Sequence, residues 1–229
     1  MPKRLAVALL FLTVAACAAN VGAVRTTHGF SLSELRSQPV AVWPIPAVKI
    51  DEVYRKTVIK AHGSSDQFID VLADKISARL AQESKASVLS SHELVAALSR
   101  SDATRPLLDS DKLLGPESDN RFASATPVDL TPLAAVAELG AVRYLVLPRD
   151  ARVIWLFTPG EGAKPGSWNV HVKLRLVVMD WKDRAVVWDG WVHGRAAPFT
   201  YATPTGELKR AEDALAKNLV DAMKSSSNR

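Results

Sequence analysis

The strongest constraint on the fold is a run of strict alternation in the second half of the chain. In "WNVHVKLRLVVMD", apolar residues at every second position from Val170 to Val178 alternate with His171, Lys173 and Arg175. Successive side chains of a β-strand point to opposite faces of its sheet, so one face is predicted to be core and the other largely solvent. The run therefore predicts a long strand that is buried on one side.

The next run, "RAVVWDGWVHG", is predicted to fold back as the antiparallel partner of this strand. The predicted register places Leu176 opposite Trp188 and, on the outer face, Arg175 opposite Asp189. A shift by one residue would move Asp189 onto the apolar face, which excludes that shift. The same register gives three further pairs, which are Asp180 with Arg184, Val172 with Val192, and His171 with His193.

Other short apolar runs predict strands at 40–45 and 86–90 and, with a break between them, over "AVRYLVLP" and "ARVIWLF". Helical spacing after capping residues predicts three helices, which begin at Ser64 or Ser65, at Ser91, and at Thr131 with a stop at Gly140. A fourth helix near the C-terminus places one set of residues on a single face, namely Leu208, Ala211, Leu215, Leu219 and Met223.

Two stretches are predicted to be irregular. A polar loop is expected between the first strand and the helix that begins at Ser64 or Ser65. Between residues 100 and 129 the apolar residues lose their period, and proline, aspartate and serine are frequent. A loop this long is unusual in a compact domain and is often functional or mobile.

The N-terminus follows the plan of a secretory signal. Residues 1–16 carry two early cations, an apolar stretch from Leu5 to Leu12 and then small residues, and the apolar stretch is too short to span a bilayer. The residues "VAAC" resemble the bacterial lipobox, which implies that Cys17 becomes the lipid-modified first residue and anchors the chain through several acyl chains. An ordinary signal peptide with a chance cysteine is the alternative. Ala18 replaces the aspartate that favours inner-membrane retention, so the resemblance implies the outer membrane.

The predicted organisation is a signal peptide over 1–16, a lipidated tether over 17–38 with a short helix at "SLSELRS", one domain over 39–224, and a disordered tail over 225–229. The predicted fold class is α/β (α+β), with a single mixed sheet, mostly antiparallel hairpins in the C-terminal half, and helices packed on the sheet. The domain would face the periplasm of a Gram-negative bacterium.

The order of elements and the quoted runs resemble an exported α/β domain found in the amino-terminal part of the Tol translocation protein, in the curli-secretion lipoprotein and in lipoprotein activators of penicillin-binding proteins. The resemblance covers most of residues 39–224 and includes "FIDVLADKISARL", "SVLSSHELVAAL" and "AEDALAKNLVDAM". It implies a non-enzymatic lipoprotein that binds and positions another envelope component. The alternative is an envelope hydrolase or small-ligand-binding lipoprotein with a pocket under the 100–129 loop.

Motifs for catalysis, metals or nucleic acid are missing from the sequence. It contains no nucleotide-binding glycine loop, nucleophile elbow, HExxH or paired-cysteine pattern, so no enzyme activity and no cofactor are expected. His171 and His193 would supply only two metal ligands, so a solvent-facing role is preferred and no metal site is predicted. The net charge of +5 falls to +3 without Lys3 and Arg4, because 27 basic residues then face 24 acidic ones. These cations are scattered, so no nucleic-acid partner is expected.

The tryptophans of the predicted hairpin are the candidate partner-binding residues. Trp188 projects to the apolar face and is predicted to be core. Trp191, beside Lys173 and Arg175 on the outer face, and Trp181, at the hairpin tip, are harder to bury. Exposed aromatic residues can anchor a protein partner, because they offer a large contact area at a low cost in side-chain entropy. Alternatively, the C-terminal helix or the 100–129 segment covers them.

Overall fold

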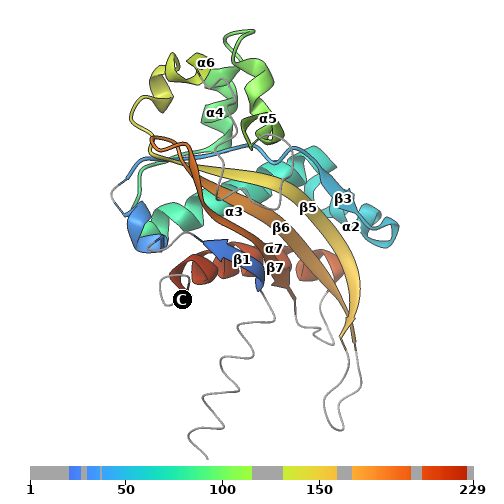
Figure 1. The fold of residues 1–229 in the computed structure, drawn as a ribbon. Coiled ribbons are helices and arrows are strands. Elements are labelled where there is room, and N and C mark those ends of the chain that lie inside the picture. Colours follow the sequence, from blue (N-terminus) through green and yellow to red (C-terminus); the bar gives the residue numbers. More distant parts are fainter. Residues whose placement is uncertain are drawn as a thin grey trace, which may run out of the picture.

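The strand predicted from alternation lies in the middle of a seven-stranded mixed sheet (Figure 1). The computed structural model describes residues 21–26, 30–36, 38–114, 131–158, 167–196 and 203–225. The strand order is β1-β7-β6-β5-β2-β4, and β3 pairs with β5 beyond β2. The strands are β1 (Val21–Thr26), β2 (Val40–Val42), β3 (Val48–Ile50), β4 (Val88–Leu89), β5 (Tyr144–Thr158), β6 (Ser167–Asp180) and β7 (Ala185–Arg195).

Helices cover both faces of this sheet. The α-helices are α2 (Glu52–His62), α3 (Ser65–Ser84), α4 (Ser91–Leu98), α5 (Ser110–Leu114), α6 (Thr131–Ala134) and α7 (Pro204–Ser225). The short 3-10 helices are η1 (Leu32–Leu35), η2 (Arg105–Leu108) and η3 (Ala137–Leu139). Helices α3 and α7 lie behind one face, while α4, α5 and α6 gather at one end of the molecule (Figure 1). The predicted α/β fold with antiparallel hairpins in its C-terminal half is confirmed.

Each face of the sheet has its own hydrophobic core. On the α3 and α7 face, the apolar positions of β6 from Val170 to Val178 are buried with Trp188. The opposite face, called the outer face below, has its apolar cluster near the β6–β7 turn, where Val177 and Met179 pack with α4, α5 and η2. Trp43 is fully buried in this second core, and its indole N–H donates to the Leu107 carbonyl oxygen at 2.8 Å.

The predicted register of the β6–β7 hairpin is wrong by two residues, although its faces are right. Val178, not Leu176, lies opposite Trp188, and Trp191, not Asp189, lies opposite Arg175. The turn is one residue longer than predicted, because Asp180 pairs with Ala185, and an irregularity beyond Met179 adds a second residue. Two shifts of one residue restore the original faces. Three predicted pairs fail for the same reason, namely Asp180 with Arg184, Val172 with Val192, and His171 with His193.

Much of the predicted tether belongs to the sheet and its core. Residues 21–26 form β1, which pairs with β7 and aligns Val21 with Val192. The predicted short helix is η1, and its Leu32 and Leu35 are buried with Phe30. These contacts remove apolar surface from water, so the chain is part of the domain from residue 21 at the latest. Cys17 and the terminal segments 1–20 and 226–229 lie outside the described residues.

Two predicted loops contain helices. The polar loop after β2 holds β3 and α2, and α2 buries only Tyr54 and Val58, which is too sparse a pattern to reveal a helix. The segment predicted to be irregular over 100–129 forms η2 and α5 as far as residue 114. Leu107, Leu113 and Leu114 are buried there, so this part of the segment is packed.

The helix boundaries follow from their caps. Ser64 caps α3 as predicted, because its hydroxyl accepts the Gln67 N–H at 3.1 Å. The cap of α4 is Ser90 rather than Ser91, since Ser90 and Glu93 form a reciprocal capping box. The predicted helix from Thr131 to Gly140 is split into α6 and η3.

The predicted break between "AVRYLVLP" and "ARVIWLF" is a bulge within one continuous strand. Strand β5 runs through both segments, and its pairing with β6 shifts between Pro148 and Asp150. The extra residue, Arg149, lets the strand continue without losing its partner.

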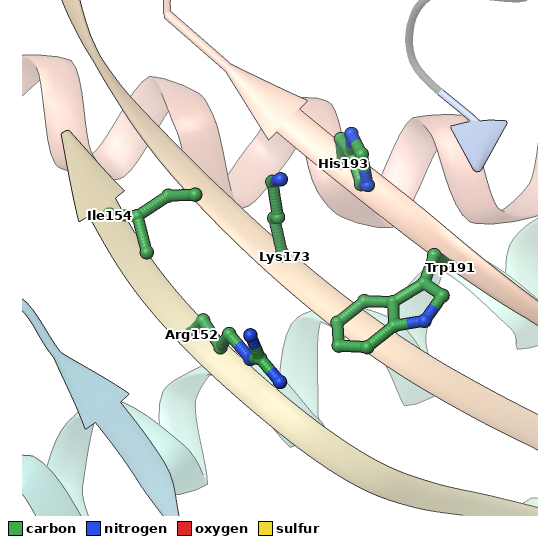
Figure 2. Close-up of a pocket in the computed structure, with 5 residues that line it drawn as sticks. All are labelled: Arg152, Ile154, Lys173, Trp191 and His193. Atoms are coloured by element: carbon green, nitrogen blue, oxygen red, sulfur yellow. The ribbon is translucent and has the colours of Figure 1, made fainter. Parts of the chain in front are cut away.

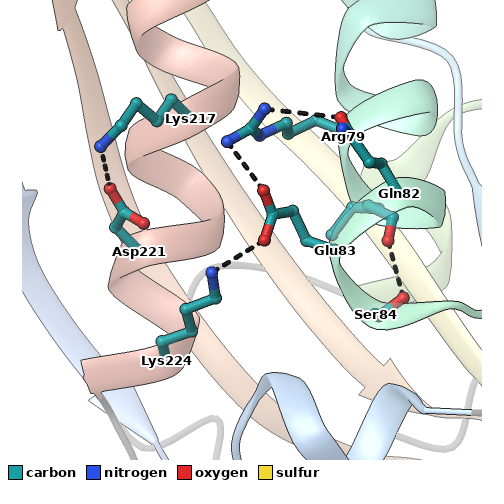
Figure 3. Close-up of polar contacts among 8 residues, drawn as sticks. Arg79, Gln82, Glu83, Ser84, Lys217, Asp221 and Lys224 are labelled. Carbon is teal, nitrogen blue, oxygen red and sulfur yellow. Dashed lines mark hydrogen bonds and ion pairs between the residues drawn. The ribbon is translucent and has the colours of Figure 1, made fainter.

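A buried carboxylate connects α7 to α2 and α3. The Glu212 side chain has no exposed surface, and its two oxygens lie 2.8 Å from His62 Nε2 and 3.0 Å from Lys75 Nζ. Farther along the helices, Glu83 of α3 forms ion pairs with Arg79 at 2.8 Å and with Lys224 of α7 at 2.9 Å (Figure 3). The Lys224 hydrogen bond lowers the pKa of Glu83. Solvent screens this second group, so it fixes geometry more than it adds stability.

Helix α7 approaches β7 most closely at Gly194. A Cβ atom at that position would lie 1.8 Å from the Ala211 carbonyl oxygen and 2.6 Å from the Leu215 nitrogen. Both are backbone atoms, so the helix would have to move to accept any side chain. The space between α7 and the sheet therefore depends on a residue without Cβ.

We predict that Gly194→Ala lowers the free energy of unfolding by about 3 kcal/mol or more, because the added methyl overpacks this contact. Urea unfolding measures the change. The matched control is Gly206→Ala in the first turn of α7, where the nearest neighbour of an added Cβ is the Thr203 hydroxyl at 3.3 Å. The control should change stability by less than about 1 kcal/mol. Equal effects of the two variants would contradict the close approach.

Candidate functional site

The outer face of the sheet has a shallow hollow where no described helix covers it. We call it the outer hollow; it measures about 340 Å³ and is lined by Arg152, Ile154, Lys173, Trp191 and His193. Figure 2 shows these side chains on three adjacent strands, with two from β5, one from β6 and two from β7. The second core fills the same face nearer the β6–β7 turn, so the hollow begins where that core ends.

The pairing of the three strands explains why these side chains meet. Arg152, Lys173 and His193 lie in one row across β5, β6 and β7. Ile154 belongs to the next row toward the β5–β6 loop, and Trp191 to the next row in the opposite direction. Because residues two apart on a strand share a face, all five side chains point to the outer side.

Cations dominate this surface. The Arg152 guanidinium lies 5.2 Å from the centre of the Trp191 ring and pairs with Asp150, whose hydrogen bond raises the pKa of Arg152. Lys173 has no ion pair with a carboxylate of the described residues. The hollow therefore combines an aromatic face, a stacked arginine and an uncompensated ammonium group, which suits a ligand carrying negative charge.

Two histidines border this surface, and the pKa values of both are lowered. Burial lowers the pKa of His171 to about 4, and the nearby Arg195, Lys173 and His193 add to the effect. Burial, followed by the charge of Lys173, also lowers the pKa of His193. Both ring nitrogens of His171 are buried without a hydrogen-bond partner in the described part of the chain. Protonation of His171 would therefore place an unpaired charge beside other cations.

The structure brings together only some of the residues singled out from the sequence. Trp191 and Lys173 line the outer hollow, and Arg175 lies opposite Trp191 but is occupied by Asp189 at 2.9 Å. Trp181 is half-buried against the second core and is not part of the hollow.

Sequence reasoning missed Arg152 and Ile154, although a signal for them existed. The turn-rich segment after β5 indicates a hairpin between β5 and β6. Pairing Thr158 with Ser167 and counting back two by two places Arg152 opposite Lys173, which is the observed register.

The two histidines weighed as metal ligands from the sequence are not paired across the strands. His171 lies opposite Arg195, and His193 opposite Lys173, so the two histidines do not face each other. Within the described ranges no three His, Cys, Asp or Glu side chains are grouped so that they could hold a metal ion. Of the 100–129 segment, the described Leu107, Leu113 and Leu114 pack in the second core, and residues 115–129, under which the alternative function also places its pocket, lie outside the described residues. No described helix is long and apolar enough to cross a bilayer.

We predict that protonation of His171 destabilises the fold at mildly acidic pH. The folded-state pKa of about 4 lies below the ordinary value of 6.5, so the unfolded chain binds more protons between these values. The contribution of His171 to stability is therefore constant above about pH 6.5 and falls as the pH is lowered toward 4. In urea unfolding at pH 7 and pH 5, His171→Gln should lose less stability between the two conditions than the unmodified chain.

The control for this experiment is His92→Gln on the exposed side of α4. It should retain the pH dependence of the unmodified chain. If His171→Gln showed that same dependence, the proposed origin of the acid sensitivity would be wrong.

Comparison with known proteins shows no family. No protein-family model and no curated protein matches the chain, so the resemblance to the Tol and curli-secretion domains stays a prediction. Among solved structures, a variant of the PelC dodecamer from Paraburkholderia phytofirmans is 16% identical with a TM-score of 0.40, and the alignment covers 89% of this chain and 99% of that chain. The hypothetical protein CT253 from Chlamydia trachomatis is 14% identical with a TM-score of 0.40, over 84% of this chain and 94% of that chain. Similarity at this level carries no inference about function.

Proposed function

We propose that this protein is a non-enzymatic lipoprotein of the bacterial outer membrane that binds and positions another envelope component. Cys17 carries the lipid anchor, and the domain faces the periplasm. The partner is a protein that docks on the outer face of β5, β6 and β7. Secretion, assembly of a surface structure and cell-wall synthesis are the processes such an accessory protein would serve.

The outer hollow is the observation that carries this proposal. The described helices cover the outer face only near the β6–β7 turn, and Trp191 remains partly accessible beside Lys173 and Arg152. Tryptophan and arginine are enriched in the energetically dominant parts of protein interfaces. Cations around the aromatic ring add charge complementarity and favour a partner segment with acidic side chains.

The proposed anchor rests on the sequence at the N-terminus. "VAAC" follows an apolar stretch, and Cys17 is the only cysteine of the chain. In an oxidising compartment a free thiol is a liability, whereas an acylated cysteine is not.

We predict that Cys17→Ser blocks acylation and releases the protein from the outer membrane, because serine has no thiol to form the thioether. Mass spectrometry of the N-terminal peptide and membrane fractionation measure both effects. The unmodified chain should begin at acylated Cys17. A mature N-terminus at Ala18 or beyond, without lipid, would show that the anchor is misassigned.

We predict that Trp191→Ala lowers the yield of the cross-linked partner complex in intact cells while changing the unfolding free energy by less than about 1 kcal/mol, since the side chain is only half-buried. Trp188→Ala is the matched core control and should cost roughly 3 to 5 kcal/mol. Thermal unfolding is recorded beside the cross-linking yield. If both variants lose stability and neither loses the complex selectively, Trp191 is a structural residue and the docking surface is wrong.

A further inference from the structure

The far end of the β5–β6 hairpin continues as a two-stranded ribbon. Strand β7 ends at Arg195, in the row of Ile154, and β3 ends at Ile50, opposite Val153. From Trp155 onward, β5 pairs only with β6 among the described strands. Figure 1 shows β5 and β6 bending and running on past the end of β7.

The ribbon leaves two large apolar side chains partly exposed. Trp155 is 36% exposed and the adjacent Leu156 is 37% exposed, and consecutive residues of a strand point to opposite faces. A contact on the outer face alone would leave one of the two side chains in water. Their partners on β6, Val170 and Asn169, are buried, so a medium that meets both faces at the β5 edge would cover both exposed side chains.

The start of the ribbon is held firmly. The Trp155 backbone N–H donates to the Asp51 carboxylate at 3.0 Å, and the Trp155 ring meets Tyr54 edge-to-face at a centroid distance of 5.6 Å. The apolar side chains are thus presented from a fixed position.

The short distance from the proposed lipid anchor to the sheet indicates that this medium is the membrane. Three residues separate Cys17 from Val21, so four steps along the chain place the acylated residue within about 14 Å of the start of β1. Val21 aligns with Val192, and through β6 with Ala151 of β5. Trp155 is four residues beyond Ala151, or about 13 Å along the strand. The anchor can therefore reach the level of Trp155, so the domain can lie with the ribbon at the bilayer surface.

The positive charge of the rows of side chains next to the ribbon also fits a membrane surface. Arg152, Lys173 and Arg195 lie on the outer side within one row of Ile154, just before the ribbon begins. Tryptophan at the level of lipid headgroups, with cations directly above it, is the arrangement that favours contact with an anionic membrane.

We propose that the ribbon of Trp155 and Leu156 inserts into the headgroup region of the membrane that holds the lipid anchor, and that the adjacent cations contact anionic headgroups. This inference rests on the proposed acylation of Cys17. It fixes the orientation of the domain, with the hairpin end against the bilayer and the β6–β7 turn away from it.

The test uses the full acylated protein in vesicles of phosphatidylethanolamine and phosphatidylglycerol, with and without a lipid that carries a nitroxide quencher near the headgroup. Because Cys17 is the only cysteine and is acylated, Leu156→Cys introduces the only free thiol, which takes a fluorescent label. The label should lose most of its fluorescence when the quencher lipid is present. The matched control is Lys182→Cys in the exposed β6–β7 turn, whose label should keep its fluorescence.

The outcomes separate this inference from the proposed function. If mass spectrometry finds Cys17 acylated but the two labels respond equally, the ribbon does not touch the membrane and the inference is wrong. If the label at position 156 is shielded from water but not quenched by the lipid, a protein surface covers the ribbon, and the inference is also wrong. If Cys17 is not acylated, the anchor fails and this inference fails with it.

Discussion

The structure depends on a change from apolar to polar and charged side chains halfway along the outer face of β6. The core face of this strand is apolar from Val170 to Val178, so α3 and α7 can pack along it. The outer face is apolar only at Val177 and Met179, and it carries His171, Lys173 and Arg175 over the remaining length. Helices can therefore cover the outer face at one end only, because a buried charge without a partner is costly. The open, cationic half is a consequence of this pattern.

The same alternation shows how far a sequence can predict a fold. It identifies the faces of β6 and β7 correctly, because burial depends on whether a position is odd or even. It does not give the register, which depends on the Asp180 carboxylate. That carboxylate accepts the N–H groups of Lys182 and Asp183 and shapes a longer turn, with Arg184 in a left-handed conformation. Such local bonds leave no periodic signal.

Elements without a clear apolar period in the sequence were also missed. Strand β1 is an edge strand, and α2 buries only Tyr54 and Val58, so neither shows the period of a packed element. Of the candidate site, Trp191 and Lys173 could be predicted because they belong to the alternating hairpin. Arg152 and Ile154 required the β5–β6 register, which follows from the pairing at the hairpin loop. From the sequence, Trp181 is predicted to be hard to bury because it lies at a turn. It packs instead against the second core, whose helices are distant in the sequence.

The position of β1 connects the two proposals. If the chain enters the sheet at Val21, the anchor leaves the domain little freedom to move away from the bilayer. The outer hollow lies in the rows directly beside the ribbon, so a partner bound there would also be held close to the membrane. Arg152 and Lys173 would then serve both surfaces, with anionic lipid competing for the cations that an acidic partner segment needs. A partner anchored in the same membrane would meet this surface at a high effective concentration, which makes a modest contact area sufficient for association.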